Sequence, residues 1–428
     1  KETAGSPNTG AFNTMSMMHQ YGAGKENGLL MSDTTSEPVS GKGGLCPKTA
    51  AVKHYDISAI NAEVTLNQWL DYYPGYMYVL TENIENVREE EAKNAEARES
   101  EGHLDPGGVK NGIQDQWIQP LVIRGNQGDC VKITLRNKLE FGEDVSLHIN
   151  GSDMVMSKTG QPATTTNPDA VAAGADEDAE EDAEEDAEGE SIEMEWYIHP
   201  DSQEGAKQFH SYSNDRELTV LGMMGTFVVE PAGSKYWEPL GTGPATEARS
   251  GWQVMIDTPN GPDFREFVLI YHEIGDEAFR PVNKHGDFLP QRDPLTDTYR
   301  PGARALNFRS EPFGINNMHV QHEYFGFEDE SMGYSSYTFG DASPTIPRSY
   351  LGDPAKFRIV HGGSEVFHSH HPHGGSIRWQ RSPRATQMPV WNTGQNGPVK
   401  YPVIRTKSDR VDVEVLGPSE ALDLETEC

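Results

Sequence analysis

The sequence predicts an all-β protein built from two tandem Greek-key β-sandwiches. Short strand-like segments recur between Gly, Pro and Asp breaks, as is typical of sandwich folds. In residues 130–136, apolar side chains alternate with polar ones at every second position, which is the period of a half-buried strand. Further strands are expected over residues 194–198, 226–229, 252–256 and 267–271.

Length and charge limit the classes of function. The 428 residues suggest two or three domains, at about 100–200 residues per domain. With 67 acidic and 35 basic residues the formal net charge is −32, which disfavours nucleic acid or an anionic membrane as a partner. Metal cations are the better candidates. No apolar run approaches the roughly 18 residues of a spanning helix, so no membrane span is expected.

An internal repeat supports two copies of one β domain. Gly128-Asp129 and Gly352-Asp353 each open a strand-like segment, and a histidine-bearing strand follows each within about twenty residues, at His148 and His368. The sequence predicts domains over residues 50–232 and 250–420, with the boundary after Pro231, where a loop begins.

Three segments depart from this pattern. Residues 1–49 lack hydrophobic periodicity and are interpreted as an extended N-terminal arm. Residues 176–190 carry 11 acidic side chains, and their mutual repulsion predicts an unpacked acidic insertion. Residues 81–100 contain good helix formers and the i,i+4 pair Glu89 and Lys93, so a solvated helix is expected there.

A dense histidine block lies at residues 366–375. It contains His368, His370, His371 and His373. Residues two apart on a strand share a face and lie roughly 6.5–7 Å apart, so His368 and His370 present two imidazoles to one side. His371 and His373 point to the other side unless Pro372 begins a turn. Metal binding is the favoured interpretation, and a surface histidine cluster is the alternative.

Two more histidines are candidate ligands. Val145, Leu147 and Ile149 occupy one face of their strand, so His148 projects from the other face, away from the core. A lone histidine of this kind is more often structural than a ligand, but its position in the repeat favours a role beside the His368 block. His210 has a similar claim. Six histidines without motif context are interpreted as structural or exposed: His54, His103, His272, His285, His319 and His322.

Several short motifs together resemble one family, the large multidomain bacterial multicopper oxidases, which include manganese-oxidase-like proteins. The similarity runs from Cys46 to Glu425. The motifs that carry it are Gly128-Asp129, Ser146-Leu147-His148, His199-Pro200-Asp201, Phe209-His210-Ser211, residues 222–231, 306–313 and 344–348, and Gly362 to His368.

The resemblance implies cupredoxin domains that bind copper. In such oxidases a type 1 copper, held by Cys and two His, passes electrons to a trinuclear cluster held by four His-x-His pairs. Here Asn150 and Tyr212 stand where the first two pairs have their second histidine, and only His368-Ser369-His370 is intact. The chain contains no His-Cys-His motif.

Two functions follow from this incomplete match. One is an extracellular oxidase of a metal ion such as Mn(II), or of a phenolic reductant, with O2, as part of a longer chain whose further cupredoxin domain or subunit supplies the missing motif. The other is a catalytically degenerate copper-binding or assembly protein, with a homo-oligomer as one form of it. Secretion and a Cys46–Cys130 disulfide are expected with either.

The surviving imidazoles predict where copper binds. If Asn150 and Tyr212 dismantle the trinuclear cluster, we expect one mononuclear site centred on His368, His370 and His373. His148 or His210 contributes only if the two domains face each other across that site.

Overall fold

The computed structural model describes residues 45–99, 117–140, 143–160, 191–213, 215–238, 246–273, 286, 288, 304–311, 335–340, 342–363, 366–373, 379–381 and 410–427. Strands hold 46% of these residues and helices hold few, so the predicted all-β sandwich fold is confirmed. The five strands expected from the sequence are all present. The acidic insertion and nearly all of the N-terminal arm lie outside the described residues.

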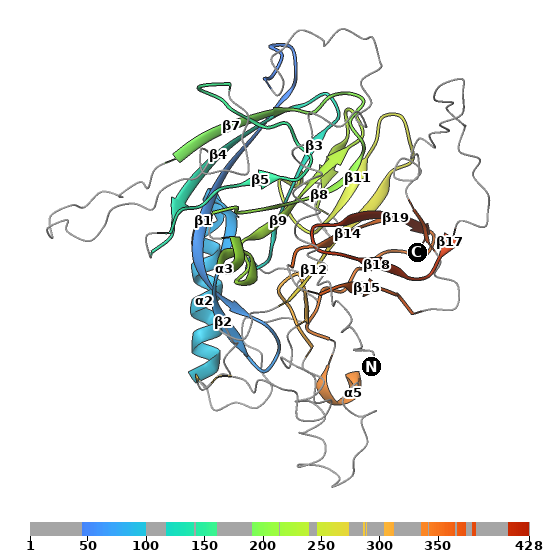
Figure 1. The fold of residues 1–428 in the computed structure, drawn as a ribbon. Coiled ribbons are helices and arrows are strands. Elements are labelled where there is room, and N and C mark those ends of the chain that lie inside the picture. The colour runs from blue at the N-terminus through green and yellow to red at the C-terminus, as the bar shows by residue number, and fades with distance from the viewer. Residues whose placement is uncertain are drawn as a thin grey trace, which may run out of the picture. The chain divides into compact units, whose positions relative to one another are not determined.

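The first sandwich contains two sheets whose inner faces share a core (Figure 1). Each sheet holds one parallel pair, β1 with β4 and β3 with β9, while its other pairs are antiparallel. Strands that are distant in sequence are therefore neighbours, as in a Greek key. The strand order of one sheet is β2 (Tyr72–Leu80), β1 (Val52–Thr65), β4 (Cys130–Lys138), β7 (Ser191–Tyr197) and β6 (Val155–Met156). That of the other is β3 (Leu121–Asn126), β9 (Met224–Glu230), β8 (Gly205–His210) and β5 (His148–Ile149).

The second sandwich has a large sheet and a small one. The large sheet runs β10 (Lys235–Trp237), β11 (Gln253–Asp257), β12 (Phe264–Glu273), β14 (Pro354–His361), β19 (Ala421–Glu427), β16 (Trp379–Arg381) and β17 (Arg410–Val411), with β13 (Arg304–Leu306) pairing β12. The small sheet pairs β15 (His368–His370) with β18 (Glu414–Leu416). Strands β12 and β14 are parallel, as β1 and β4 are in the first sandwich.

The Gly-Asp repeat makes the same turn in both sandwiches. Gly128 and Gly352 have φ values of 91° and 88°, in the region that favours glycine. The Asp129 carboxylate accepts from Asn126 N at 2.9 Å, and the Asp353 carboxylate accepts from Tyr350 N at 3.0 Å. Each turn then opens the strand that pairs in parallel with the first long strand of its sandwich. The repeat inferred from sequence is therefore confirmed.

Helices are few among the described residues. They are η1 (Thr81–Asn83), α2 (Ile84–Glu99), α3 (Asp215–Val220) and α5 (Ser336–Phe339). Helix α2 runs beside β1 and β2 in Figure 1, and its Glu89–Lys93 pair is present at 3.7 Å. The expectation of a solvated helix is met in part, because most of its residues are exposed or half-buried while Val87, Glu90 and Asn94 are buried. No described helix has the length and apolar character needed to cross a bilayer.

Buried ion pairs connect the two sandwiches. Arg124 of β3 lies 2.7 Å from Glu266 of β12. Arg358 of β14 contacts Glu266 at 2.9 Å and reaches Glu230 of β9 at 3.2 Å. One hydrophobic core also runs through both sandwiches. The domain boundary after Pro231 therefore stays a prediction, although the sheets themselves divide between β9 and β10.

One disulfide ties the start of the described chain to the first sandwich. Cys46 and Cys130 are bonded, and Cys46 N donates to the Glu195 carboxylate at 3.1 Å. The predicted pairing is confirmed. The third cysteine, Cys428, lies outside the described residues.

Candidate metal centre

Three strand ends of the second sandwich bring ligand-type side chains together. Strands β12 and β14 are parallel, with Tyr271 opposite His361, so their carboxyl ends lie at the same edge of the sheet. Glu273 is the last residue of β12 and His361 the last of β14. His368 begins β15, and its Nε2 lies 3.0 Å from Glu273 Oε1 at this edge.

The ligand atoms of Glu273, His361 and His368 lie within 4.8 Å of one another. Glu273 Oε1 is 3.0 Å from His368 Nε2 and 3.9 Å from His361 Nε2. All three side chains are buried. Ligands bound at about 2.0–2.1 Å around one tetrahedral ion lie roughly 3.3 Å apart. Two imidazoles and one carboxylate therefore fit a single transition-metal ion with positions left open.

The protonation states of the cluster bear on metal binding. Burial alone raises the pKa of Glu273, but the hydrogen bond from His368 and the charges of His361 and His368 outweigh it and bring the pKa to about 2. Burial lowers the pKa of His361. The Glu273 carboxylate is ready to bind an ion, whereas His361 Nε2 and His368 Nε2 face acceptor oxygens and must first release their protons or pass them to Nδ1. His361 Nε2 also contacts the Val366 carbonyl at 2.6 Å, so an ion at this atom has to displace that hydrogen bond.

Two glycines make room for the cluster. A Cβ on Gly363 would lie 1.8 Å from Glu273 Oε2, so only glycine lets the carboxylate approach the backbone. A Cβ on Gly362 would lie 2.4 Å from Met224 Sδ and 2.6 Å from Ile270 Cγ2. The Gly-Gly pair after His361 is therefore part of the site.

His370 faces the same side as His368 but has a different partner. Both are buried while Ser369 between them is exposed, so the predicted shared face is confirmed. His370 Nδ1 and the Tyr271 hydroxyl form a hydrogen bond of 2.8 Å. Burial lowers the pKa of His370 to about 4 and raises that of Tyr271 to about 12. The Tyr271–His370 pair is thus a second hydrogen bond between β12 and β15, beside the Glu273–His368 pair.

The other histidines of the block lie apart from this cluster. His371 Nδ1 bonds the Asp412 carbonyl, and the rings of His371 and His373 lie 5.0 Å apart. Both residues are exposed. The structure thus does not bring His371 or His373 into the group with His368, and their role as ligands stays a prediction.

His272 is structural, as expected from its lack of a motif. Its Nδ1 donates to the Glu273 carbonyl at 2.8 Å, and its Nε2 accepts from Phe308 N at 3.0 Å. Burial lowers its pKa to about 4. Both ring nitrogens are therefore occupied, and the histidine fixes the backbone beside Glu273.

A second histidine cluster lies in the first sandwich. His148 and His210 are directly opposite each other on β5 and β8. The Tyr212 ring lies 4.3 Å from the His210 ring and 5.3 Å from that of His148, centroid to centroid. Val145, Leu147 and Ile149 are fully buried, which confirms that His148 projects from the other face.

Asn150 and Tyr212 form a hydrogen bond with each other. The Tyr212 hydroxyl donates to Asn150 Oδ1 at 3.0 Å. These are the two positions at which the resemblance expects imidazoles. Cys46 and Cys130 are bonded as a disulfide, so neither offers a thiolate. Within the described ranges, the side chains present do not fit a trinuclear or a type 1 copper centre.

Sequence reasoning missed Glu273 and left His361 out of the ligand set. Glu273 has a usable signal, because it is a carboxylate ending the apolar run of β12. His361 ends the strand that follows the Gly-Asp repeat. Their meeting depends on the parallel pairing of β12 and β14, which the sequence does not display.

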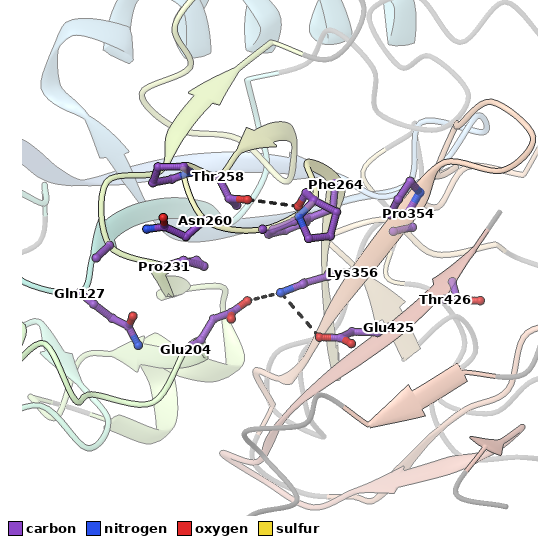
Figure 2. Close-up of a pocket in the computed structure, with 15 residues that line it drawn as sticks. Gln127, Glu204, Pro231, Thr258, Asn260, Phe264, Pro354, Lys356, Glu425 and Thr426 are labelled. Carbon is purple, nitrogen blue, oxygen red and sulfur yellow. Dashed lines mark hydrogen bonds and ion pairs between the residues drawn. The ribbon is translucent and has the colours of Figure 1, made fainter. Parts of the chain in front are cut away.

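A separate cavity lies at the other end of the same two strands. It has a volume of about 790 Å³ and is lined by Phe264 and Pro354, which begin β12 and β14. Figure 2 shows Lys356 in this cavity between Glu204 and Glu425, and Lys356 Nζ is 3.6 Å from Glu425 Oε1. No candidate metal ligand named above lines it.

Comparison with known proteins gives structural likeness only. A scan of protein-family models finds no match. No curated protein matches the sequence significantly. A copper nitrite reductase from Nitrosomonas europaea is 15% identical, with a TM-score of 0.42 over 87% of this chain and 84% of that one. A multicopper oxidase is 12% identical, with a TM-score of 0.42 over 90% and 84%. A blue copper oxidase from Nitrosomonas europaea is 13% identical, with a TM-score of 0.39 over 87% and 75%. At identities this low, the fold assignment rests on strand order and register.

Proposed function

We propose that the protein binds one copper ion at Glu273, His361 and His368 and belongs outside the cell. The observation that carries this proposal is the convergence of three buried ligand atoms from three strand ends within 4.8 Å. Imidazole and carboxylate ligands suit Cu(II), and copper binds more tightly than zinc at a given nitrogen and oxygen site. The Cys46–Cys130 disulfide supports an oxidising compartment.

The chain's own residues have separable roles in this proposal. His361 and His368 supply neutral nitrogen ligands, and Glu273 supplies the negative charge that balances the ion. His272 holds the Glu273 backbone, and Gly363 admits its carboxylate. A bound copper ion supplies one-electron redox chemistry. The Tyr271–His370 pair borders the site, because the Tyr271 ring lies 5.7 Å from the His368 ring, centroid to centroid.

Oxidation of Mn(II) or a phenol with O2 is the second candidate function. The single His368-Ser369-His370 pair, both of whose imidazoles are buried on one face, favours it. The Tyr212–Asn150 hydrogen bond favours the copper-binding or assembly role. Oxygen uptake by the copper-loaded chain with each reductant separates the two, because only the oxidase consumes O2 in proportion to the reductant.

Metal analysis of the purified chain tests the proposal. We expect about one equivalent of copper, and we expect the double variant His361→Ala/His368→Ala to lose it. The double variant His371→Ala/His373→Ala is the matched control, because it removes two exposed imidazoles of the same block. Undiminished copper in the first variant, or its loss in the control alone, would contradict the assignment.

A further inference from the structure

Three side chains of the first sandwich form one line of hydrogen bonds that ends beside the metal cluster. The Tyr212 hydroxyl donates to Asn150 Oδ1 at 3.0 Å, and Asn150 Nδ2 donates to Gln208 Oε1 at 3.3 Å. Gln208 Nε2 then donates to the Gly362 carbonyl at 3.3 Å. Gly362 follows His361 directly, so the line crosses from the first sandwich to a ligand of the second.

Gln208 and Gly362, at the end of this line of hydrogen bonds, are fixed by further contacts. Gln208 is 2% exposed on β8, and Figure 1 shows β8 beside β14 and β19, which it contacts. Gln208 O also accepts from Asn150 N at 2.9 Å, which fixes the two residues to each other. On the other side, Gly362 N donates to Tyr271 O at 2.8 Å. Gly362, the residue after His361, is therefore held by β12 through its N–H and by Gln208 through its carbonyl.

We infer that Gln208, Asn150 and Tyr212 are positioning residues for the metal site of the second sandwich. This inference rests on the proposed function, since it concerns the geometry of the same three ligands. Residues that hydrogen-bond around a metal site set the orientation of its ligands, and their loss typically costs 10- to 100-fold in metal affinity. Asn150 and Tyr212, which stand where the resemblance expects histidines, have here a different task, which is to hold Gly362 through Gln208.

The hydrogen bond to the Gly362 carbonyl affects the positions of the metal ligands. Gly362 is buried, so loss of the Gln208 amide leaves its carbonyl without this donor. The peptide group between Gly362 and Gly363 would then rotate. Gly363, whose lack of a side chain leaves space for the Glu273 carboxylate, would move with it. His361 and Glu273 are displaced together, while the strands that carry them stay paired.

The test compares copper dissociation constants and Co(II) absorption spectra of four proteins. They are the wild-type chain, Gln208→Met, Tyr212→Phe and Tyr236→Phe. Gln208→Met keeps the side-chain length but removes both hydrogen bonds, and Tyr212→Phe removes one hydroxyl from the far end. Tyr236→Phe is the matched control, because it removes a Tyr–Asn126 hydrogen bond at the opposite end of the first sandwich.

We expect Gln208→Met to weaken copper binding by about 10-fold or more and to change the Co(II) spectrum. Tyr212→Phe should weaken binding less, by about 2- to 5-fold, since it loosens only the end of the line. Tyr236→Phe should keep the wild-type constant and spectrum.

Each other outcome is decisive. If Gln208→Met fails to fold, wild-type values in Tyr212→Phe overturn the inference. Wild-type values in Gln208→Met, or equal weakening in Tyr236→Phe, also overturn it and leave the proposed function intact. If the wild-type chain itself binds no copper, the proposed function fails and the inference with it.

Discussion

Gly363 decides where the Glu273 carboxylate can lie. A Cβ at this position would lie 1.8 Å from Glu273 Oε2, so the carboxylate occupies the place that a side chain of residue 363 would need. We therefore expect Gly363→Ala to move the carboxylate and weaken copper binding by about 10-fold or more. Gly261→Ala is the control, since its Cβ would meet only Thr258 Oγ1, at 3.2 Å. Competition titration with a copper chelator measures both, and a wild-type constant in Gly363→Ala would contradict this role.

His272 predicts a pH dependence of stability. Burial lowers its pKa from 6.5 to about 4, so between these values the unfolded chain binds a proton that the folded chain does not. The contribution of His272 to the free energy of unfolding is therefore fully present above pH 6.5. It falls by up to about 3 kcal/mol as the pH drops towards 4.

The variant His272→Gln should flatten this part of the profile. Urea unfolding of the chain at several pH values measures the slope, and His54→Gln is the control because His54 is exposed. An unchanged slope in His272→Gln would show that other groups dominate acid destabilisation.

At the scale of single residues, the sequence predicted on which face of a strand a side chain lies, but not which residue it contacts. The alternation rule correctly placed His368 and His370 on one face and His148 opposite Leu147. It could not predict that Tyr271 bonds His370, or that Glu273 bonds His368, because those contacts join strands about a hundred residues apart. Local periodicity carries no information about such pairs.

At the scale of elements, Arg358 of β14 joins two sandwiches. It is fully buried and contacts Glu230, Glu266 and Asp423. Burial, followed by repulsion from Glu266, raises the pKa of Glu230. Removal of the guanidinium leaves several carboxyl groups buried without their cation, which is strongly destabilising.

We expect Arg358→Met to lower the free energy of unfolding by about 3–5 kcal/mol. The matched control is Arg249→Met, which breaks an exposed pair with Glu82 at 3.0 Å and should cost under about 1 kcal/mol. Urea denaturation measures both. Equal effects of the two substitutions would show that the buried network does not hold the sandwiches together.

Helix α2 shows why an element can be predicted while its environment is not. Good helix formers and the Glu89–Lys93 pair indicated the helix correctly. Glu90 is nevertheless buried, because it accepts from Trp117 N and Ile118 N and lies 3.5 Å from Arg309. These partners are distant in sequence, so composition alone suggested a solvated surface.

At the scale of the whole molecule, the Gly-Asp repeat predicted a tandem architecture. Its two turns have matching φ angles and matching aspartate hydrogen bonds. The sequence could not show that the sandwiches share one core and a buried ion network. The line from Tyr212 to Gly362 belongs to the same interface, so the metal site depends on both halves of the described chain.

X-ray absorption spectroscopy of the copper-loaded chain tests the central claim most directly. The account predicts one copper ion with only nitrogen and oxygen neighbours at about 2.0–2.1 Å, two of them imidazoles, and loss of this signal in His361→Ala/His368→Ala. A sulfur neighbour, or a copper–copper distance of about 3.5–4 Å, would contradict a single site at Glu273, His361 and His368.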